Sequence, residues 1–342
     1  MKNKPAMIIA TLQLWAVSLV VPSCNIEGDL EECPYNARLE YWYTGTGQAN
    51  ILPDYIFNMK EFVFDSLQVL RRVNELGGKK NIAAELNLPP GRYTLVAWGN
   101  QDSLSSLSEA EIGRTKLTDV LLHANNPVSP QTRVNVPLRQ QNNEPLYYGY
   151  ASFTIQSRGV SRQRIDMVHA HLKLDITVKW KGKAPTDTGD MYMLLSDVPS
   201  TYSFLPEFEV KGSPYSTYST AADGTPTRSG VWYYIPEHSD DHPLVSHEVP
   251  VKMDITRTVS ATFISYRIRN DDHPVVRLYG GGKQLIKDID LYKYFRTMQI
   301  DLDENLRQEF SLVMEVDAAG GVIVSSATVS VWVDGGAIGG ML

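Results

Sequence analysis

IDMVHAHLKLDITVKW, residues 165–180, alternates apolar and polar side chains more regularly than any other part of this 342-residue chain. Successive side chains of an extended strand point to opposite faces of a sheet, so a period of two predicts a strand with one face in a core. The other face carries two histidines, two lysines and an aspartate, and we expect it to lie in solvent. The apolar face is formed by Val168, Ala170, Leu172, Leu174, Ile176, Val178 and Trp180.

Shorter segments on both sides repeat the strand pattern. ARLEYWYT (37–44) has one apolar face, whereas TLVAW (94–98) follows a Pro-Pro-Gly turn and is apolar on both faces, which predicts the middle of a covered sheet. Further strands are predicted at 145–155 and near 309–316, and a short helix at 288–296. Short strands with turn signals about every ten residues are typical of β-sandwiches. We therefore expect an all-β protein with two β-sandwiches in tandem.

Charge, glycine and serine interrupt the strand pattern at QSRGVSRQR (156–164). A polar break of this kind is typical of a domain boundary. We therefore expect an N-terminal sandwich over residues 37–160 and a C-terminal sandwich over residues 161–342. The segment at 203–230 is rich in Ser, Thr and Tyr and is predicted to be a long polar loop.

The first 23 residues have the composition of a secretion signal. Lys2 and Lys4 precede an apolar run, residues 6–21, which is short for a membrane-spanning helix of about 20 residues. The run leads into Cys24 as in a bacterial lipobox, so we expect residues 1–23 to be a lipoprotein signal peptide and Cys24 to be acylated. Two alternatives stay open: cleavage that leaves Cys24 as a plain thiol, and an uncleaved anchor helix.

Residues 24–36 are acidic and are expected to form a lipidated linker ahead of the first strand. The whole chain has a net charge of −7, which becomes −9 without residues 1–23 because that segment holds two lysines and no acid. This charge speaks against nucleic-acid binding, which needs a basic surface. Cys33 is the second of two cysteines and has no partner if Cys24 carries lipid, whereas a Cys24–Cys33 disulfide would compete with acylation.

Two histidine-containing patterns raise the question of metal or acid-base chemistry. His169 and His171 lie at i and i+2 on one strand face, which is half of a zinc site, but no third ligand stands near them in the sequence. Asp-Asp-His-Pro occurs at 240–243 and again at 271–274, where it is typical of a turn that enters an edge strand. The sequence contains no G-x-S-x-G or H-E-x-x-H motif. We expect no metal, no cofactor and no enzymatic activity.

Cys24, Asp29-Leu30 and Cys33-Pro34 stand in this order before the strand ARLEYWY (37–43). This order resembles the mature start of the anchor lipoproteins of Bacteroidetes type V fimbriae, in which an acidic-Leu-x-x-Cys-Pro element follows the lipidated cysteine. LPPGRYTLVAWGN (88–100) resembles the Pro-Gly-x-Tyr strand of that family. EPLYYGYASF (144–153), followed by the long amphipathic strand, resembles the family's junction between two domains.

The resemblance implies two transthyretin-like or Ig-like sandwich domains on a protein held at the surface of the outer membrane by acyl chains, palmitate among them, on Cys24. It implies fimbrial subunits as partners, a role in fimbrial anchoring, assembly and length control, and through fimbriae a part in cell adhesion and virulence. Such fimbriae polymerise by strand donation, in which main-chain hydrogen bonds to a neighbour's sheet supply affinity. The candidate donor strand contains Thr328, Val329, Val331 and Val333.

Two other functions fit the same sequence. A polymerising stalk or tip subunit would lose its first strand by cleavage after a basic residue, for which Arg71 and Arg72 are the best candidates. A surface glycan-binding lipoprotein would use exposed aromatic rings. The aromatic clusters lie at 39–43, 145–150 and 230–236, and alternation predicts that most of their rings face a core.

Overall fold

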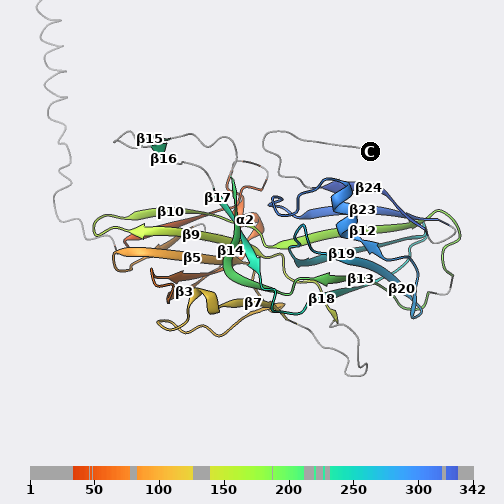
Figure 1. Cartoon of the computed structure of the whole chain (residues 1–342), viewed down its shortest axis with the longest axis horizontal. Helices are drawn as coiled ribbons and strands as arrows, with labels where there is room; N and C mark the ends of the chain where they lie inside the picture. Colours follow the sequence, from red (N-terminus) through yellow and green to blue (C-terminus); the bar gives the residue numbers. More distant parts are fainter. Residues whose placement is uncertain are drawn as a thin grey trace, which may run out of the picture.

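The structure is a computed structural model that describes residues 34–45, 47, 49–77, 83–125, 139–186, 188–211, 219–220, 226–227, 232–317 and 321–329. Within these residues the regular structure is nearly all β. Two β-sandwiches lie side by side, and a further sheet lies between and beneath them (Figure 1). The expected all-β sandwich architecture is confirmed.

The first sandwich packs a three-stranded sheet against one face of a five-stranded sheet, with Leu39, Tyr41 and Val63 buried between them. The segment TLVAW lies in the centre of the larger sheet, as its two apolar faces predict: Leu95 faces this core and Trp98 is buried on the opposite face. The smaller sheet has the order β10 (Ser161–Asp166), β1 (Ala37–Trp42) and β4 (Ala83–Leu86). The larger sheet has the order β11 (Val168–His169), β9 (Tyr147–Ile155), β5 (Gly91–Gly99), β2 (Asn58–Phe64) and β3 (Leu70–Gly77), and α2 (Leu52–Tyr55) lies between β1 and β2 in the chain.

The second sandwich has its own core between a four-stranded and a six-stranded sheet. Its central strand β12 (His171–Trp180) is the regular segment of the sequence, and the apolar face from Leu172 to Val178 is fully buried. The four-stranded sheet has the order β19 (Thr258–Tyr266), β12, β23 (Glu309–Val316) and β24 (Val322–Val329). The other sheet contains β21 (Lys283–Gln284), β20 (Val275–Gly280), β13 (Met191–Val198), β18 (Val245–Val251) and β8 (Arg139–Gln140), with β22 (Ile289–Asp290) beside β20. The predicted helix is α3 (Leu291–Thr297), with the Asp290 side chain as its N-cap.

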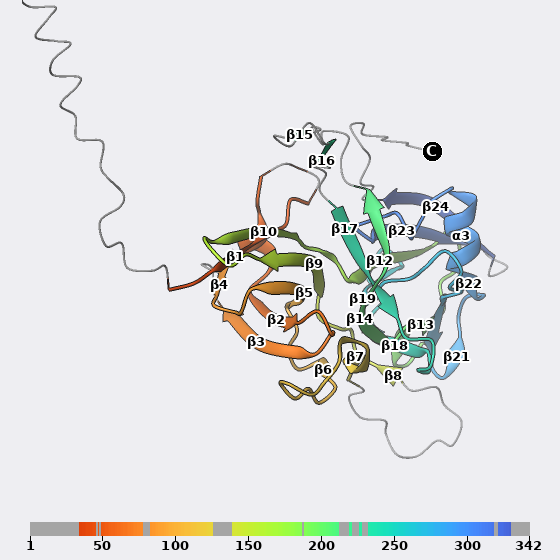
Figure 2. The same ribbon diagram turned by 60° about the vertical axis from the view of Figure 1, so that its left-hand side comes forward.

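A third layer covers the outer face of the five-stranded sheet (Figure 2). Trp98, Tyr148 and Phe204 meet between this layer and the sheet in a separate cluster. This layer corrects the prediction of a loop at 203–230, because β14 (Thr201–Lys211), the longest strand of the described chain, begins before that region and continues into it. Its residues Tyr202 and Phe204 alternate inward and are fully buried. The layer has the order β17 (Trp232–His238), β14 (Thr201–Lys211), β7 (Leu121–Ala124) and β6 (Ser105–Leu107), with a 3-10 turn at Leu117–Asp119; β15 (Ser219–Thr220) and β16 (Pro226–Thr227) form a separate pair.

Strands are exchanged between the two sandwiches. β10 and β11 follow the predicted boundary at residue 160 but pair with β1 and β9 of the first sandwich. In the other direction, β8 pairs with β18, and the amide of Asn143 donates to the carbonyl of Ile264 at 2.8 Å in the second sandwich. The chain therefore passes from the sheets of the first sandwich to those of the second at Ala170, rather than at the predicted boundary between residues 160 and 161. The polar break at 156–164 corresponds to the turn from β9 into β10.

Candidate functional site

Arg267 is a buried cation where the two sandwiches meet. It directly follows β19, and its guanidinium donates to four backbone carbonyls at 2.9–3.4 Å, those of His169, Leu302, Asn305 and Leu306. Burial lowers the pKa of Arg267 to about 10, because the loss of water penalises the charged form. His169 belongs to the first sandwich and the other three carbonyls to the loop before β23, so one side chain ties the two bodies together.

Tyr202 of β14 reaches the same junction from the third layer. Its hydroxyl donates to the carbonyl of Ala170 at 2.7 Å and accepts a hydrogen bond from the backbone amide of Arg267, also at 2.7 Å. The ring stacks on Tyr266 with centroids 4.4 Å apart. The chain passes from one sandwich to the other at Ala170, so the hydrogen bond from the Tyr202 hydroxyl holds the backbone of this connecting segment in place.

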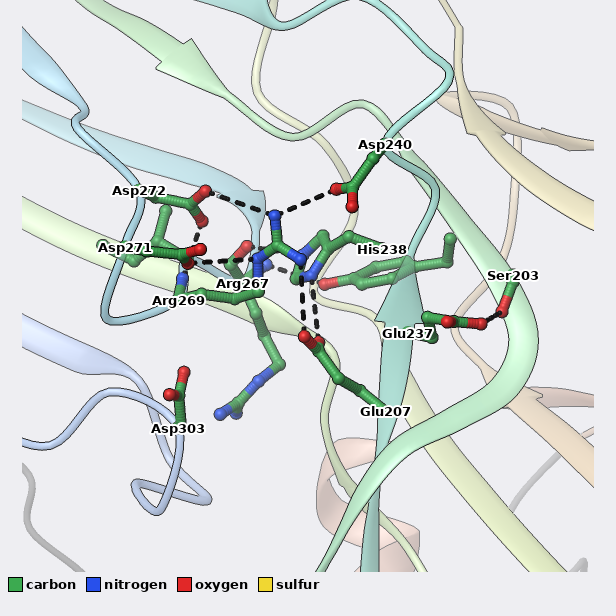
Figure 3. Close-up of polar contacts among 12 residues, drawn as sticks. Ser203, Glu207, Glu237, His238, Asp240, Arg267, Arg269, Asp271, Asp272 and Asp303 are labelled. Carbon is green, nitrogen blue, oxygen red and sulfur yellow. Dashed lines mark hydrogen bonds and ion pairs between the residues drawn. The ribbon is translucent and has the colours of Figure 1, made fainter.

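Arg269, two residues further on, is surrounded by carboxylates (Figure 3). Its guanidinium lies 3.0 Å from Asp240, 3.4 Å from Glu207, 3.5 Å from Asp271 and 3.8 Å from Asp272. Asp240 comes from the first Asp-Asp-His-Pro segment, and Asp271 and Asp272 come from the second. The structure thus brings the two repeated motifs of the sequence into one group, which we call the Arg269 cluster.

The charges of the Arg269 cluster compensate one another. Burial acts to raise the pKa of Glu207, but His238 and Arg269 outweigh it and lower that pKa. Burial acts to lower the pKa of Arg269, yet Asp272 and Glu207 raise it above its usual value. Burial raises the pKa of Asp272. All these acids face one guanidinium, which is the arrangement of a structural ion-pair network rather than of a general acid and base.

Both Asp-Asp-His-Pro segments form turns, as the sequence predicts, the first between β17 and β18 and the second between β19 and β20. The second turn is closed by the carboxylate of Asp272, which accepts from the Arg269 amide at 2.7 Å. Asn270 beside it donates to Asp301 and Asp303 at 2.9 and 2.8 Å. These contacts and the Arg269 cluster therefore hold together three loops at one end of the second sandwich: 239–244, 269–274 and 301–303.

His169 and His171 are buried, which corrects the prediction that their face of the strand lies in solvent. Rings of Tyr43 and Tyr147 from the first sandwich cover them there. The two imidazoles stack with centroids 4.4 Å apart, and one nitrogen of each lies within 4.8 Å of a Glu309 oxygen and of the other. Burial lowers the pKa of both histidines, that of His171 to about 4. Sequence reasoning missed Glu309, because only the parallel pairing of β12 with β23 brings it close.

The residues predicted for lipidation and strand donation are only partly within the described structure. Cys24, Val331 and Val333 lie outside the described residues. Thr328 and Val329 lie in β24, where they pair with β23 at the edge of the four-stranded sheet. The candidate donor strand therefore begins inside the protein's own sheet. In the described part of the chain, no helix has the length and apolar character needed to cross a membrane.

Both candidate cleavage positions lie in β3. Arg72 pairs with Val63 of β2, and Arg71 lies at the irregularity between this pair and the next one, Phe64 with Leu70. Of the aromatic clusters, Tyr41 and Tyr148 are fully buried, as alternation predicts. Rings that fill a core are not free to stack on sugars, so Tyr41 and Tyr148 do not support glycan binding, whereas Trp42, Tyr150 and Tyr234 are partly exposed.

Solved structures that are similar to this chain include a fimbrial anchor protein and adhesin-like proteins. The chain is similar to the fimbrial anchor protein Mfa2 from Porphyromonas gingivalis, with a TM-score of 0.58 and 16% identity over 88% of this chain and 98% of that chain. It is also similar to a candidate adhesin from Bacteroides thetaiotaomicron, with a TM-score of 0.57 and 15% identity over 89% and 98%. A candidate polysaccharide-binding protein from the same organism gives a TM-score of 0.60 and 13% identity over 86% and 96%. At these identities the likeness shows the fold alone.

The structure thus defines a β-sandwich protein whose fold is shared with fimbrial anchor and adhesin proteins. The family model for fimbrillin-A associated anchor proteins Mfa1 and Mfa2 matches residues 30–336, and the chain belongs to this family. The resemblance seen in the N-terminal motifs is confirmed. A comparison with curated proteins gives no match. The family is one of fimbrial anchors rather than of enzymes, and it indicates a location at the cell surface.

Proposed function

We propose that this protein is an outer-membrane lipoprotein that anchors a fimbrium to the cell and supports its assembly and length control. Residues 1–23 would be removed as a signal peptide, and acyl chains on Cys24 would hold the mature chain in the membrane. The acidic segment 24–36 would then separate the lipid from the first strand. Fimbrial subunits are the partners, joined by strand donation.

The observation that carries this proposal is the position of β1, directly after the acidic segment. β1 lies in the middle of its sheet, between β10 and β4, and Ala37, Leu39 and Tyr41 are fully buried. A subunit that is activated by cleavage after Arg71 or Arg72 would lose this strand and part of its core. An anchor must keep β1, because its lipid lies ahead of it in the chain.

The contact with the fimbrium would use a sheet edge. β24 is the edge strand of the four-stranded sheet, and an edge strand offers backbone amides and carbonyls on its outer side to another chain. A strand from a fimbrial subunit could add there, or the segment that includes Val331 and Val333 could be lent to a subunit. In both cases the fimbrial subunit would attach near the C-terminal end of the chain, far in sequence from the lipid on Cys24.

The test is a matched pair of cysteine variants in the native cell. Wild type, Cys24→Ala and Cys33→Ala are compared by intact mass, by membrane fractionation and by electron microscopy of the cell surface. We expect an acyl adduct on wild type and on Cys33→Ala, and an unmodified protein with fimbriae shed into the medium for Cys24→Ala. Normal attached fimbriae in Cys24→Ala cells would refute the anchor role.

The same mass measurement separates the anchor from a stalk or tip subunit. The anchor should be intact from Cys24 through Arg72. A mature chain that starts after Arg71 or Arg72, found within isolated fimbriae, would instead identify a polymerising subunit.

A further inference from the structure

His169, His171 and Glu309 converge from three strands at the junction of the sandwiches. His169 ends β11 in the first sandwich, whereas His171 begins β12 and Glu309 begins β23 in the second. Residues at i and i+2 of an extended chain point to one side, so both imidazoles face the same space. One nitrogen or oxygen from each of the three residues lies within 4.8 Å of the other two.

The two histidines have nitrogen atoms available as ligands. The ring Nδ1 of His171 donates to the carbonyl of Leu146 at 2.8 Å, which leaves a lone pair on Nε2. His169 shares its Nε2 with the hydroxyl of Tyr43 at 2.6 Å, and its Nδ1 is buried without a hydrogen-bond partner. A buried, unpaired ring nitrogen is costly, and a metal ion would satisfy it. A backbone carbonyl bonded to the far nitrogen of a histidine is also the usual support of a metal ligand.

We propose that His169, His171 and Glu309 form a binding site for a divalent transition-metal ion, with Zn²⁺ as the best match. Two imidazoles and one carboxylate are a ligand set that Zn²⁺ takes in proteins, with a fourth position left for water. A cavity of about 20 Å³, lined by Tyr43, His169 and Arg307, adjoins the histidine and has room for one water molecule.

Binding requires two local movements. Zinc ligands lie about 2.0–2.2 Å from the ion, so the three ligand atoms must draw together from their present separation. The stacked imidazoles, inclined by 17°, must turn until both lone pairs meet. Arg307 must release Glu309, because its guanidinium forms an ion pair with that carboxylate at 2.8 Å. Arg307 is partly exposed and can turn toward solvent, so the ion replaces its charge.

The buried guanidinium of Arg267 limits the affinity. It donates to the carbonyl of His169 at 3.1 Å and is held in place by three further carbonyls, so its positive charge stays close to the ion. Like charges at this distance in a poorly hydrated site repel. We therefore expect micromolar rather than nanomolar binding. The ion would join β11 of one sandwich to β12 and β23 of the other, and its effect would be to stiffen the junction.

The experiment uses the full chain, purified from membranes in detergent and stripped with a chelator, with ZnCl₂ as the probe. Isothermal titration and thermal unfolding are measured for wild type, Glu309→Gln and the matched control Glu315→Gln. Glu315 lies further along the same strand and also pairs with a cation, Lys181, at 2.5 Å. We expect wild type and Glu315→Gln to bind one ion and to gain about 3–5 °C in Tm at a hundredfold excess over Kd. Glu309→Gln should bind at least tenfold more weakly.

A third variant, Arg307→Gln, tests the competition for Glu309. Removal of the competing cation should tighten Zn²⁺ binding, a result that adventitious binding to surface histidines or to cysteines would not give. The proposal is overturned if wild type shows neither heat nor a shift in Tm. It is equally overturned if Glu309→Gln binds as tightly as Glu315→Gln.

Discussion

Acid should weaken the second sandwich through one buried histidine, His247 of β18. Its ring Nδ1 donates to the carbonyl of Gln141 at 2.7 Å, and the residue is 0% exposed. Gln141 follows β8, the strand that the N-terminal half contributes to this sandwich. Burial lowers the pKa of His247 to about 4, against roughly 6.5 in an unfolded chain. The proton therefore binds the unfolded chain first as the pH falls.

The sign and size of the effect follow from these two pKa values. Above about pH 6.5 the residue is neutral in both states, and its full contribution to stability is present. Between about pH 6.5 and pH 4 the unfolded state holds the proton and the folded state does not, so the free energy of unfolding falls with the pH. At pH 5 the loss amounts to roughly 2 kcal/mol from His247.

Urea unfolding at pH 7.5 and pH 5, with a chelator present, measures the loss. His247→Gln keeps an amide donor for the Gln141 carbonyl but cannot take up a proton. Wild type should therefore lose about 2 kcal/mol more than the variant between the two pH values, while His169 and His171 act alike in both proteins and cancel. The exposed His273 gives the matched control His273→Gln, which should follow wild type. Equal losses in wild type and His247→Gln would refute the reasoning.

Three other substitutions test the packing, each by urea unfolding. Arg267→Met leaves four buried carbonyls without their donor and should lower the free energy of unfolding by at least about 3 kcal/mol. Tyr202→Phe removes the hydroxyl that joins Ala170 to the Arg267 amide and should cost about 1–3 kcal/mol, whereas Tyr279→Phe on a partly exposed ring should stay within about 0.5 kcal/mol. Gly149→Ala places a Cβ 2.5 Å from the Met167 sulfur and 2.8 Å from an Ile165 methyl, for a loss of about 1–3 kcal/mol. If Arg267→Met, Tyr202→Phe or Gly149→Ala lowers the free energy of unfolding by less than about 0.5 kcal/mol, the contact that it tests is contradicted.

The strands that the sequence predicted well are those whose burial is decided within the strand itself. β12 has an unbroken apolar face, and β5 is apolar on both faces, so each specifies its place in a sheet without reference to a partner. β14 was missed because Ser203, Pro206 and Glu207 make its sequence look like a polar loop, and only Tyr202 and Phe204 mark its inward face.

The junction could not be predicted, because it is made by residues that are remote in the chain. His169 and His171 are buried by rings of the first sandwich, which the alternation of their own strand does not reveal. Likewise, the two Asp-Asp-His-Pro turns were correctly expected as turns, but nothing in either copy indicates that Arg269 would lie between them. Pairing between distant strands decides these contacts, and a single sequence does not display it.

The place of β1 matters for how the protein resists mechanical load. If the chain is held at its N-terminus while a filament pulls on the folded domains, Ala37 at the start of β1 is the first residue of a sheet to bear the force. β1 runs parallel to β10 over six residue pairs and antiparallel to β4 over four, so a pull along the strand loads both ladders at once instead of opening them one bond at a time. Survival under such tension depends on the rate of forced unfolding rather than on equilibrium stability. If Cys24 carries lipid as proposed, the first strand after the lipid is therefore paired on both sides, and the protein should unfold elsewhere before β1 is pulled out of its sheet.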